Sequence, residues 1–120
     1  MGSKSAVIRV DANRKVYFGA TSGQQFTLPL GLPTYLELHY ASNIELSVGA
    51  IKNTIQGPET LPAFLNLFPS NEWNKVYIDL TDYLKTHTDA LSFEIYFFCS
   101  FNANVPNNRI LLDNIKLIHQ

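Results

Sequence analysis

The segment "LSFEIYFFCSF", residues 91–101, decides the fold class of this chain. Apolar side chains occupy its odd positions: Leu91, Phe93, Ile95, Phe97, Cys99 and Phe101. Alternation with a period of two is typical of a β-strand with one buried face, whereas an amphipathic helix repeats about every 3.6 residues. The aromatic and β-branched residues also favour a strand, and the length of the run predicts a central one.

The same period recurs along most of the chain. It predicts further strands over residues 5–11, 15–20, 25–30, 34–41, 43–50, 62–68, 75–80 and 109–118. Within each strand we expect alternate residues to point into a core, for example Val16 together with Phe18. Turn-forming residues separate the strands, as at Gly57–Pro58 and Pro69–Asn71.

The segment "TDYLKTH", residues 81–87, departs from this pattern. Thr81 is a residue type that caps helices, and good helix formers follow it, so we predict one or two helical turns here. Eight or nine short strands with almost no helix predict an all-β fold, a two-layer antiparallel β-sandwich with one short helix near 81–87.

The composition is that of one globular domain, which we place at residues 4–120. Of the 120 residues 46% are apolar and 16% charged, and the net charge is −1. Met1–Ser3 can be read as an expression scar, and the chain as a piece of a longer one. No basic stripe is present to neutralise phosphates, which argues against nucleic acid as a partner. No run of about 18 apolar residues occurs, so the sequence predicts no membrane span.

No motif indicates catalysis. The histidines are His39, His87 and His119, and their spacing fits no zinc site. Glu37 could act as a base with His39 on the same strand face, but no nucleophile accompanies them, so a surface pair is favoured. The single cysteine, Cys99, lies in an apolar row and is interpreted as a small buried hydrophobe. We therefore predict that the protein is not an enzyme.

Several aromatic and polar side chains fall on outward rows of the predicted strands. Sugar-binding sites combine a flat aromatic ring with a few polar groups that orient the hydroxyls. The candidate ligand-binding residues are Tyr35, Glu37, His39, Trp73 and Tyr77. Tyr96 and Phe98 share another outward row, where the 81–87 helix or a long loop could cover them. The favoured alternative for Trp73 is that it covers an edge of the core.

Four stretches together carry a family resemblance: "LPTYLELHYASNIELSVGA", "EWNKVYIDLTDYL", "LSFEIYFF" and "RILLDNIKLI". They resemble the β-sandwich modules of Bacteroidetes surface lipoproteins, which are similar to the galactose-binding-like jelly rolls that serve as carbohydrate-binding modules. The resemblance covers nearly the whole chain. Its most specific parts are the "YLEL.Y.SN" strand and the W-x-K-V-Y-I-D-L strand. A jelly-roll arrangement of the sandwich is what the resemblance implies.

The resemblance also implies a function class and a location. The chain would be a non-catalytic module of a secreted or surface lipoprotein of the cell envelope, binding glycan or another envelope component. The signal and lipidation segment of such lipoproteins is not among these residues. The alternative is a structural or protein-interaction spacer domain with no small ligand.

Asp113 stands out in "RILLDNIKLI", residues 109–118, because strict alternation places it on the same face as Leu111 and Ile115. A buried carboxylate needs a partner. In jelly rolls of the type resembled, the aspartate of the last strand often ligates a structural calcium ion, which implies Asp113 as a ligand and Asp11 as the early candidate for a second one.

The favoured alternative for Asp113 needs no metal ion. Its carboxylate would accept hydrogen bonds from backbone N–H groups, or pair with Arg109 or Lys116. The calcium interpretation is weakened by the start of the chain, since a "G-S-x-S" stretch that follows the first strand in the resembled modules stands here at residues 2–5. If the first strand of the resembled modules is absent here, the final strand, residues 109–118, lacks the neighbour with which it commonly pairs. Its unpaired backbone N–H and C=O groups would then be exposed. We therefore expect residues 109–118 to self-associate or to be covered by the N-terminal residues folding back.

Overall fold

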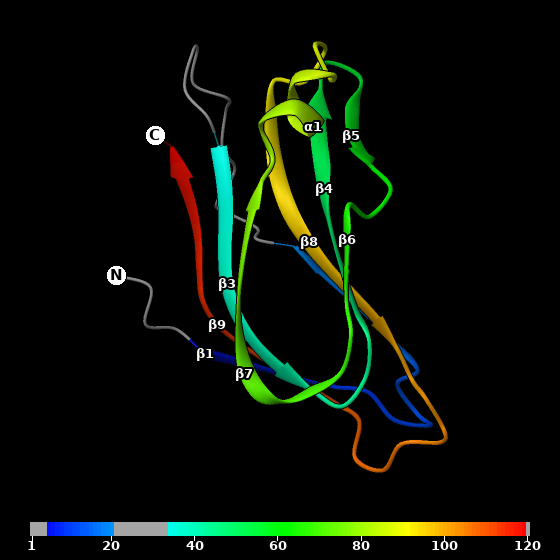
Figure 1. Ribbon diagram of the computed structural model, residues 1–120. Coiled ribbons are helices and arrows are strands. Elements are labelled where there is room, and N and C mark those ends of the chain that lie inside the picture. The colour runs from blue at the N-terminus through cyan, green and yellow to red at the C-terminus, as the bar shows by residue number, and fades with distance from the viewer. Residues whose placement is uncertain (1–4, 21–33, 120) are drawn as a thin grey trace.

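The computed structural model describes residues 5–20 and 34–119, which form two antiparallel sheets packed face to face (Figure 1). Sheet A has the strand order β1-β9-β3-β7, and sheet B has the order β2-β8-β4-β5, with β6 also paired to β4. The elements are β1 Ser5–Arg9, β2 Val16–Ala20, β3 Thr34–Ser42, β4 Leu46–Thr54, β5 Gly57–Thr60, β6 Leu65–Leu67, β7 Ser70–Asp79, α1 Thr81–Lys85, β8 Ser92–Ser100 and β9 Arg109–His119.

The predicted all-β sandwich with one short helix is therefore confirmed. The predicted strand over residues 25–30 lies outside the described part of the chain. None of the described helices is long and apolar enough to cross a membrane.

Two elements differ from the predictions at turns. Gly57 was expected in a turn but begins β5, since its φ of 118° and a 2.9 Å hydrogen bond from Thr54 Oγ1 to its carbonyl close a hairpin. The strand β7 begins at Ser70 and not at residue 75. An irregularity in β3 after Tyr40 lets Ser42 pair with Ser70, so pairing continues past the point where the turn was expected.

The core lies between the two sheets and consists of the inward rows of their strands. Its largest fully buried side chains include Leu36, Leu38, Leu46, Val48, Leu80, Leu84, Ile95 and Ile110. In β8 the row predicted from the sequence is buried at Phe93, Ile95, Phe97 and Cys99, but Leu91 lies before the strand and is 60% exposed. The helix α1 closes one end of the core through Leu84.

Asp113 does not lie in the inward row of β9, contrary to the expectation. Ile110 and Leu112 are buried, so in this half of the strand the odd residues point outward. Asn114 then adopts a positive φ of 53°, at a point where the pairing of β9 with β3 shifts register. The extra residue of such a bulge moves later side chains to the opposite face, so that Ile115 packs against the core.

The N-terminal strand occupies the edge that was expected to be exposed. Residues 5–9 of β1 pair antiparallel with residues 109–113 of β9, whose other side pairs with β3. Folding back of the N-terminal residues, one of the two expected solutions, is what the structure shows.

Candidate functional site

The predicted ligand-binding residues come together on the outer face of sheet A. Tyr35, Glu37 and His39 project from β3, and its neighbour β7 pairs with it in a register that sets Tyr77 opposite Glu37. Trp73 lies further along β7 on the same face. The structure thus shows that β3 and β7 are neighbours, which the sequence alone could not establish.

Most polar groups on this face already interact with each other. The rings of Tyr35 and Tyr77 stack, with centroids 5.0 Å apart and planes at 12°. Glu37 lies between the ammonium groups of Lys75 (3.6 Å) and Lys116 (3.8 Å), and its side chain is only 12% exposed. Its charge is therefore compensated within the protein, which leaves little of it for a ligand.

The surroundings of His39 do not suit a catalytic role, and the exposure of Trp73 does not suit a role in the core. His39 Nδ1 lies 3.3 Å from the Asn114 side-chain amide, and Glu37 is engaged by lysines, so no base and orienting group form here. Trp73 is 52% exposed and therefore does not serve mainly as a cover of the core, which was the favoured alternative.

The outer face of sheet B carries an aromatic row that the sequence reasoning found only in part. Across the strands, Phe18 of β2 pairs with Phe98 of β8, Phe98 pairs with Ser47 of β4, and Ser47 pairs with Asn66 of β6. Directly paired residues point to the same face, so two rings and two polar groups form one line. Phe98 is 37% exposed.

Phe18 was expected to point inward together with Val16, and the structure contradicts this. Both are about half exposed, and it is Tyr17 that packs against the core. The reason is the pairing partner, since Tyr17 lies opposite the buried Cys99. In a strand of five residues, where Tyr17 and Phe18 are both aromatic, the alternation alone does not distinguish the two faces.

Tyr96 forms a rigid base beside this row. It is 5% exposed, its ring lies across Gly49 of β4, and the segment between β5 and β6 reaches it at Leu61. The hydroxyl donates a 2.7 Å hydrogen bond to the Leu61 carbonyl, and Phe18 stacks on the ring at 5.0 Å. Burial raises the pKa of Tyr96 above its usual value, which keeps the hydroxyl protonated and able to donate.

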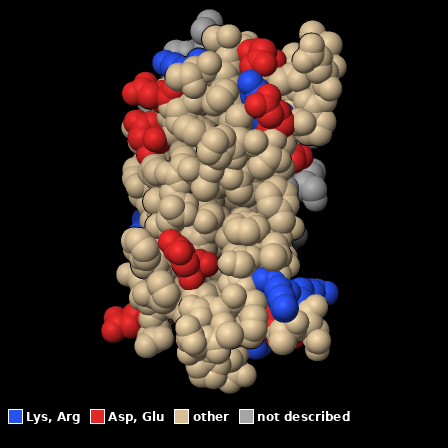
Figure 2. All heavy atoms as spheres, turned by 90° about the vertical axis from the view of Figure 1, so that its right-hand side faces the viewer, with Lys and Arg blue, Asp and Glu red and all other residues tan. Residues whose placement is uncertain are grey.

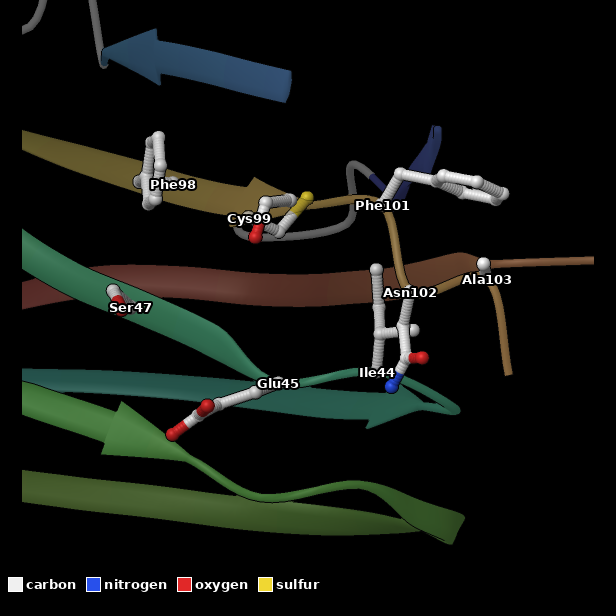
Figure 3. Close-up of a pocket in the computed structure, with 9 residues that line it drawn as sticks. Ile44, Glu45, Ser47, Phe98, Cys99, Phe101, Asn102 and Ala103 are labelled. Atoms are coloured by element: carbon white, nitrogen blue, oxygen red, sulfur yellow. The ribbon is translucent and has the colours of Figure 1, made fainter. Parts of the chain in front are cut away.

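A hollow of about 380 Å³ adjoins the row at one end of sheet B. Glu45, Ser47 and Phe98 lie along it and Asn102 lies at its end (Figure 3). The strands β4 and β8 bend along their length, so that this outer face lies on the inner side of the bend (Figure 1). Figure 2 looks onto this face, where charged side chains are sparse over the middle and gather toward the ends and edges.

The two candidate calcium ligands are not brought together. Asp113 is opposite Ser5 at one end of β1, whereas Asp11 follows the other end, about 20 Å away along an extended strand. Asp11 Oδ1 accepts backbone hydrogen bonds from Asn13 and Arg14, both at 2.8 Å, and Asp113 Oδ1 accepts one from the Asn114 N–H, also at 2.8 Å. Within residues 5–20 and 34–119, no group of three His, Cys, Asp or Glu side chains could hold a metal ion.

Cys99 lines the inner wall of the hollow but is 2% exposed. Desolvation raises the pKa of the thiol above its usual value, which disfavours the reactive thiolate. This agrees with its interpretation as a small hydrophobe.

No known protein family and no curated protein matches this sequence. Solved structures do match. One of CBM4 has a TM-score of 0.60 at 14% identity, over 97% of this chain and 71% of that chain. A variant of CBM29-2, a family 29 carbohydrate-binding module, has a TM-score of 0.58 at 14% identity, over 96% of this chain and 65% of that one. This chain thus spans less than two thirds of the length of the CBM29-2 chain.

A family 11 carbohydrate-binding module of the cellulosomal cellulase Lic26A-Cel5E of Clostridium thermocellum has a TM-score of 0.53 at 16% identity, covering 100% of this chain and 89% of that one. A family 11 module of the same organism was also solved in complex with a β-1,3-1,4-mixed-linked tetrasaccharide. The chain therefore has the jelly-roll β-sandwich fold of carbohydrate-binding modules.

Proposed function

We propose that the protein is a non-catalytic module that binds a neutral glycan on the outer face of sheet B. The observation that carries the proposal is the cross-strand row of Phe18, Phe98, Ser47 and Asn66 beside the hollow. A pyranose has a C–H face that packs on an aromatic ring and a rim of hydroxyls that need hydrogen-bond partners. The row supplies both kinds of group in one line.

Each part of the row has a distinct task in this proposal. The exposed ring of Phe98 stacks on a sugar, with Phe18 extending the aromatic surface across the next strand. Ser47 Oγ donates a 2.7 Å hydrogen bond to Asn66 Oδ1. The two side chains are therefore already oriented when they meet the hydroxyls of the sugar. Glu45 lines the hollow as an additional acceptor.

The setting of this module follows the resemblance stated from the sequence. We propose that it belongs to a secreted or surface lipoprotein of the cell envelope. Its fold is shared with carbohydrate-binding modules, and one of those has been solved with a β-1,3-1,4-mixed-linked tetrasaccharide. A neutral oligosaccharide of this linkage is therefore the first ligand to test.

The test is a glycan array followed by titration calorimetry with the best neutral ligand. The Phe98→Ala variant should lose at least about tenfold in affinity, or about 1.4 kcal/mol. Tyr77→Ala is the matched control, because it removes an exposed ring from the outer face of sheet A.

The outcomes separate the alternatives. Loss of binding in Tyr77→Ala with Phe98→Ala unchanged would move the site to the sheet A face of Tyr35, Glu37, His39 and Tyr77. Binding to no glycan in the native chain would contradict the proposal and favour the spacer domain with no small ligand.

A further inference from the structure

A second hollow lies on the outer face of sheet A, at the end of β7 away from α1. Its volume is about 130 Å³, and Trp73, Ala41 and Leu111 give it an apolar floor and one aromatic wall. Ala41 and Leu111 are paired across β3 and β9, so the floor is part of a regular sheet. The Trp73 side chain is half exposed, so that part of its indole surface is available to a ligand.

The opposite wall of this hollow is Arg109, and its backbone is held firmly. Its N–H donates to Asn43 Oδ1 at 2.8 Å, and its carbonyl accepts from the Asn43 N–H at 3.2 Å. The Asn43 side chain in turn donates to the carbonyls of Pro106 and Asn107. The start of β9 is thus tied to the preceding loop, which fixes the base of the Arg109 side chain.

The charge next to this hollow is not compensated by the protein. Arg109 pairs directly with Arg9 of β1, and both are exposed on the same face. Like charges directly opposite on neighbouring strands are destabilising. Among the described residues all ion pairs are made by Lys52, Lys75 and Lys116, so neither arginine has a carboxylate within 4.0 Å there. An anionic ligand would relieve the repulsion.

We propose that this hollow binds an acidic sugar residue, a pyranose that carries a carboxylate. The sugar ring packs on Trp73, and its carboxylate accepts hydrogen bonds from the guanidinium of Arg109, a geometry that planar guanidinium groups favour. Arg9 adds a second positive charge. Asn71 at the rim offers an amide to a hydroxyl. A hollow of this size fits one sugar residue, so the end or a side branch of an acidic polysaccharide is the matching ligand.

This site is independent of the neutral-glycan site on sheet B, because it lies on the opposite face and requires charge. The test is titration calorimetry of the whole chain with trigalacturonate and with its fully methyl-esterified form, which keeps the rings but removes the charges. The variants are Trp73→Ala and Arg109→Gln. Arg14→Gln is the control, since it removes an exposed arginine outside the hollow.

We expect the native chain to bind the acid at least about tenfold more tightly than the ester. Trp73→Ala and Arg109→Gln should each weaken binding of the acid by about tenfold, while Arg14→Gln and Phe98→Ala stay within about twofold of the native chain. Equal affinity for acid and ester would overturn the proposal, as would an unchanged Arg109→Gln variant.

Failure of trigalacturonate, triglucuronate and trimannuronate to bind at millimolar concentration would also overturn it. Arg109 is exposed, and thermal unfolding can verify that the Arg109→Gln variant is folded. Unchanged binding in that variant is therefore interpretable even if Trp73→Ala is destabilised.

Discussion

At Gly49 the missing side chain is what lets the Tyr96 ring lie flat on β4. A Cβ at this position would overlap the ring atoms of Tyr96. Replacing glycine by alanine in a strand usually stabilises a protein through the entropy of the unfolded chain. Here we expect the opposite, because a hydrogen bond to Leu61 and the stacked Phe18 hold the ring. Gly49→Ala should lower the free energy of unfolding by about 1–3 kcal/mol, measured by urea denaturation.

A double-mutant cycle isolates the cause of this effect. In a Tyr96→Ala background the Gly49→Ala substitution should be neutral or stabilising, because the overlap is gone. An equal cost in both backgrounds would show that the ring is not responsible.

The carboxylates of Asp11 and Asp113 give a prediction about calcium. Both already accept backbone hydrogen bonds, and they lie at opposite ends of β1. We expect the melting temperature to be the same in excess calcium and in excess chelator. A higher melting temperature in calcium would reveal an ion bound to the folded state and revive the calcium interpretation.

Single residues were predicted well in the regular part of β3 and poorly in the short strand β2 and in the bulged strand β9. Tyr35, Glu37 and His39 lie on one face as expected, since residues 34–40 of β3 alternate strictly between buried and partly exposed side chains. Phe18 was assigned to the wrong face because both it and its neighbour Tyr17 are aromatic. What decides between them is the pairing with β8, and this non-local contact has no local signature in the sequence.

At the level of elements, the bulge at Asn114 determines which side chains of β9 point inward. Its φ of 53° lies in the left-handed region, which asparagine tolerates and β-branched residues do not. Asn114→Val should therefore lower the free energy of unfolding by about 1–2 kcal/mol in thermal denaturation. Asn114→Gly is the matched control and should be close to neutral. Equal losses in both variants would assign the effect to the contact with His39.

The entry of α1 gives a prediction about pH. Asp79 Oδ1 accepts a 2.9 Å hydrogen bond from the Thr81 N–H, and its bonds to Thr81 hold the pKa of Asp79 below its usual value. A lowered pKa in the folded state means that the ionised carboxylate stabilises the fold above its unfolded-state pKa, and that this contribution is lost as the pH falls through the lowered pKa.

Asp79→Ala should accordingly unfold more easily than the native chain at neutral pH, with the two melting temperatures converging toward acid. The measurement is the melting temperature as a function of pH. A difference between the two proteins that persists at the lowest pH would contradict this account.

Elements, too, were predictable only as far as local signals reach. The long strands were found because alternation is a local pattern, and the helix was found from its run of helix formers. Thr81 was expected to cap this helix but lies inside it, and the N-cap residue Leu80 forms no side-chain cap hydrogen bond. The bulge in β9 was missed because asparagine fits a strand edge, a turn or a left-handed residue equally well. Because the bulge was not predicted, Asp113 was assigned to the inward face of β9. The expectation of a buried carboxylate that needs a partner followed from this wrong assignment.

At the level of the whole molecule, β1 protects the edge of sheet A. It pairs with residues 109–113, so its removal would leave that part of β9 with unpaired N–H and C=O groups. Deletion of residues 1–9 should therefore cause self-association, seen by light scattering as a mass that rises with concentration. The full chain is the control and should stay monodisperse. A truncated chain that remains a monomer would show that β1 is dispensable for this protection.

The candidate site as a whole needed the topology. Outward aromatic residues were visible in the sequence, but their division between two opposite faces follows from strand orders that place β7 beside β3 and β2 beside β8. This division separates a neutral aromatic row from a hollow flanked by arginines.

The pairing of the first described strand with the last also determines how the domain responds to tension. Ser5 lies opposite Asp113, and the remainder of β9 continues past it in the same direction to His119. A force that pulls these two ends apart would load the β1–β9 hydrogen bonds one after another, as in a zipper, and never all at once as in shear. A chain pulled at these two ends would then yield at the β1–β9 pairing first. The domain would act as a weak mechanical link that opens from its ends while the opposite sheet keeps its pairing.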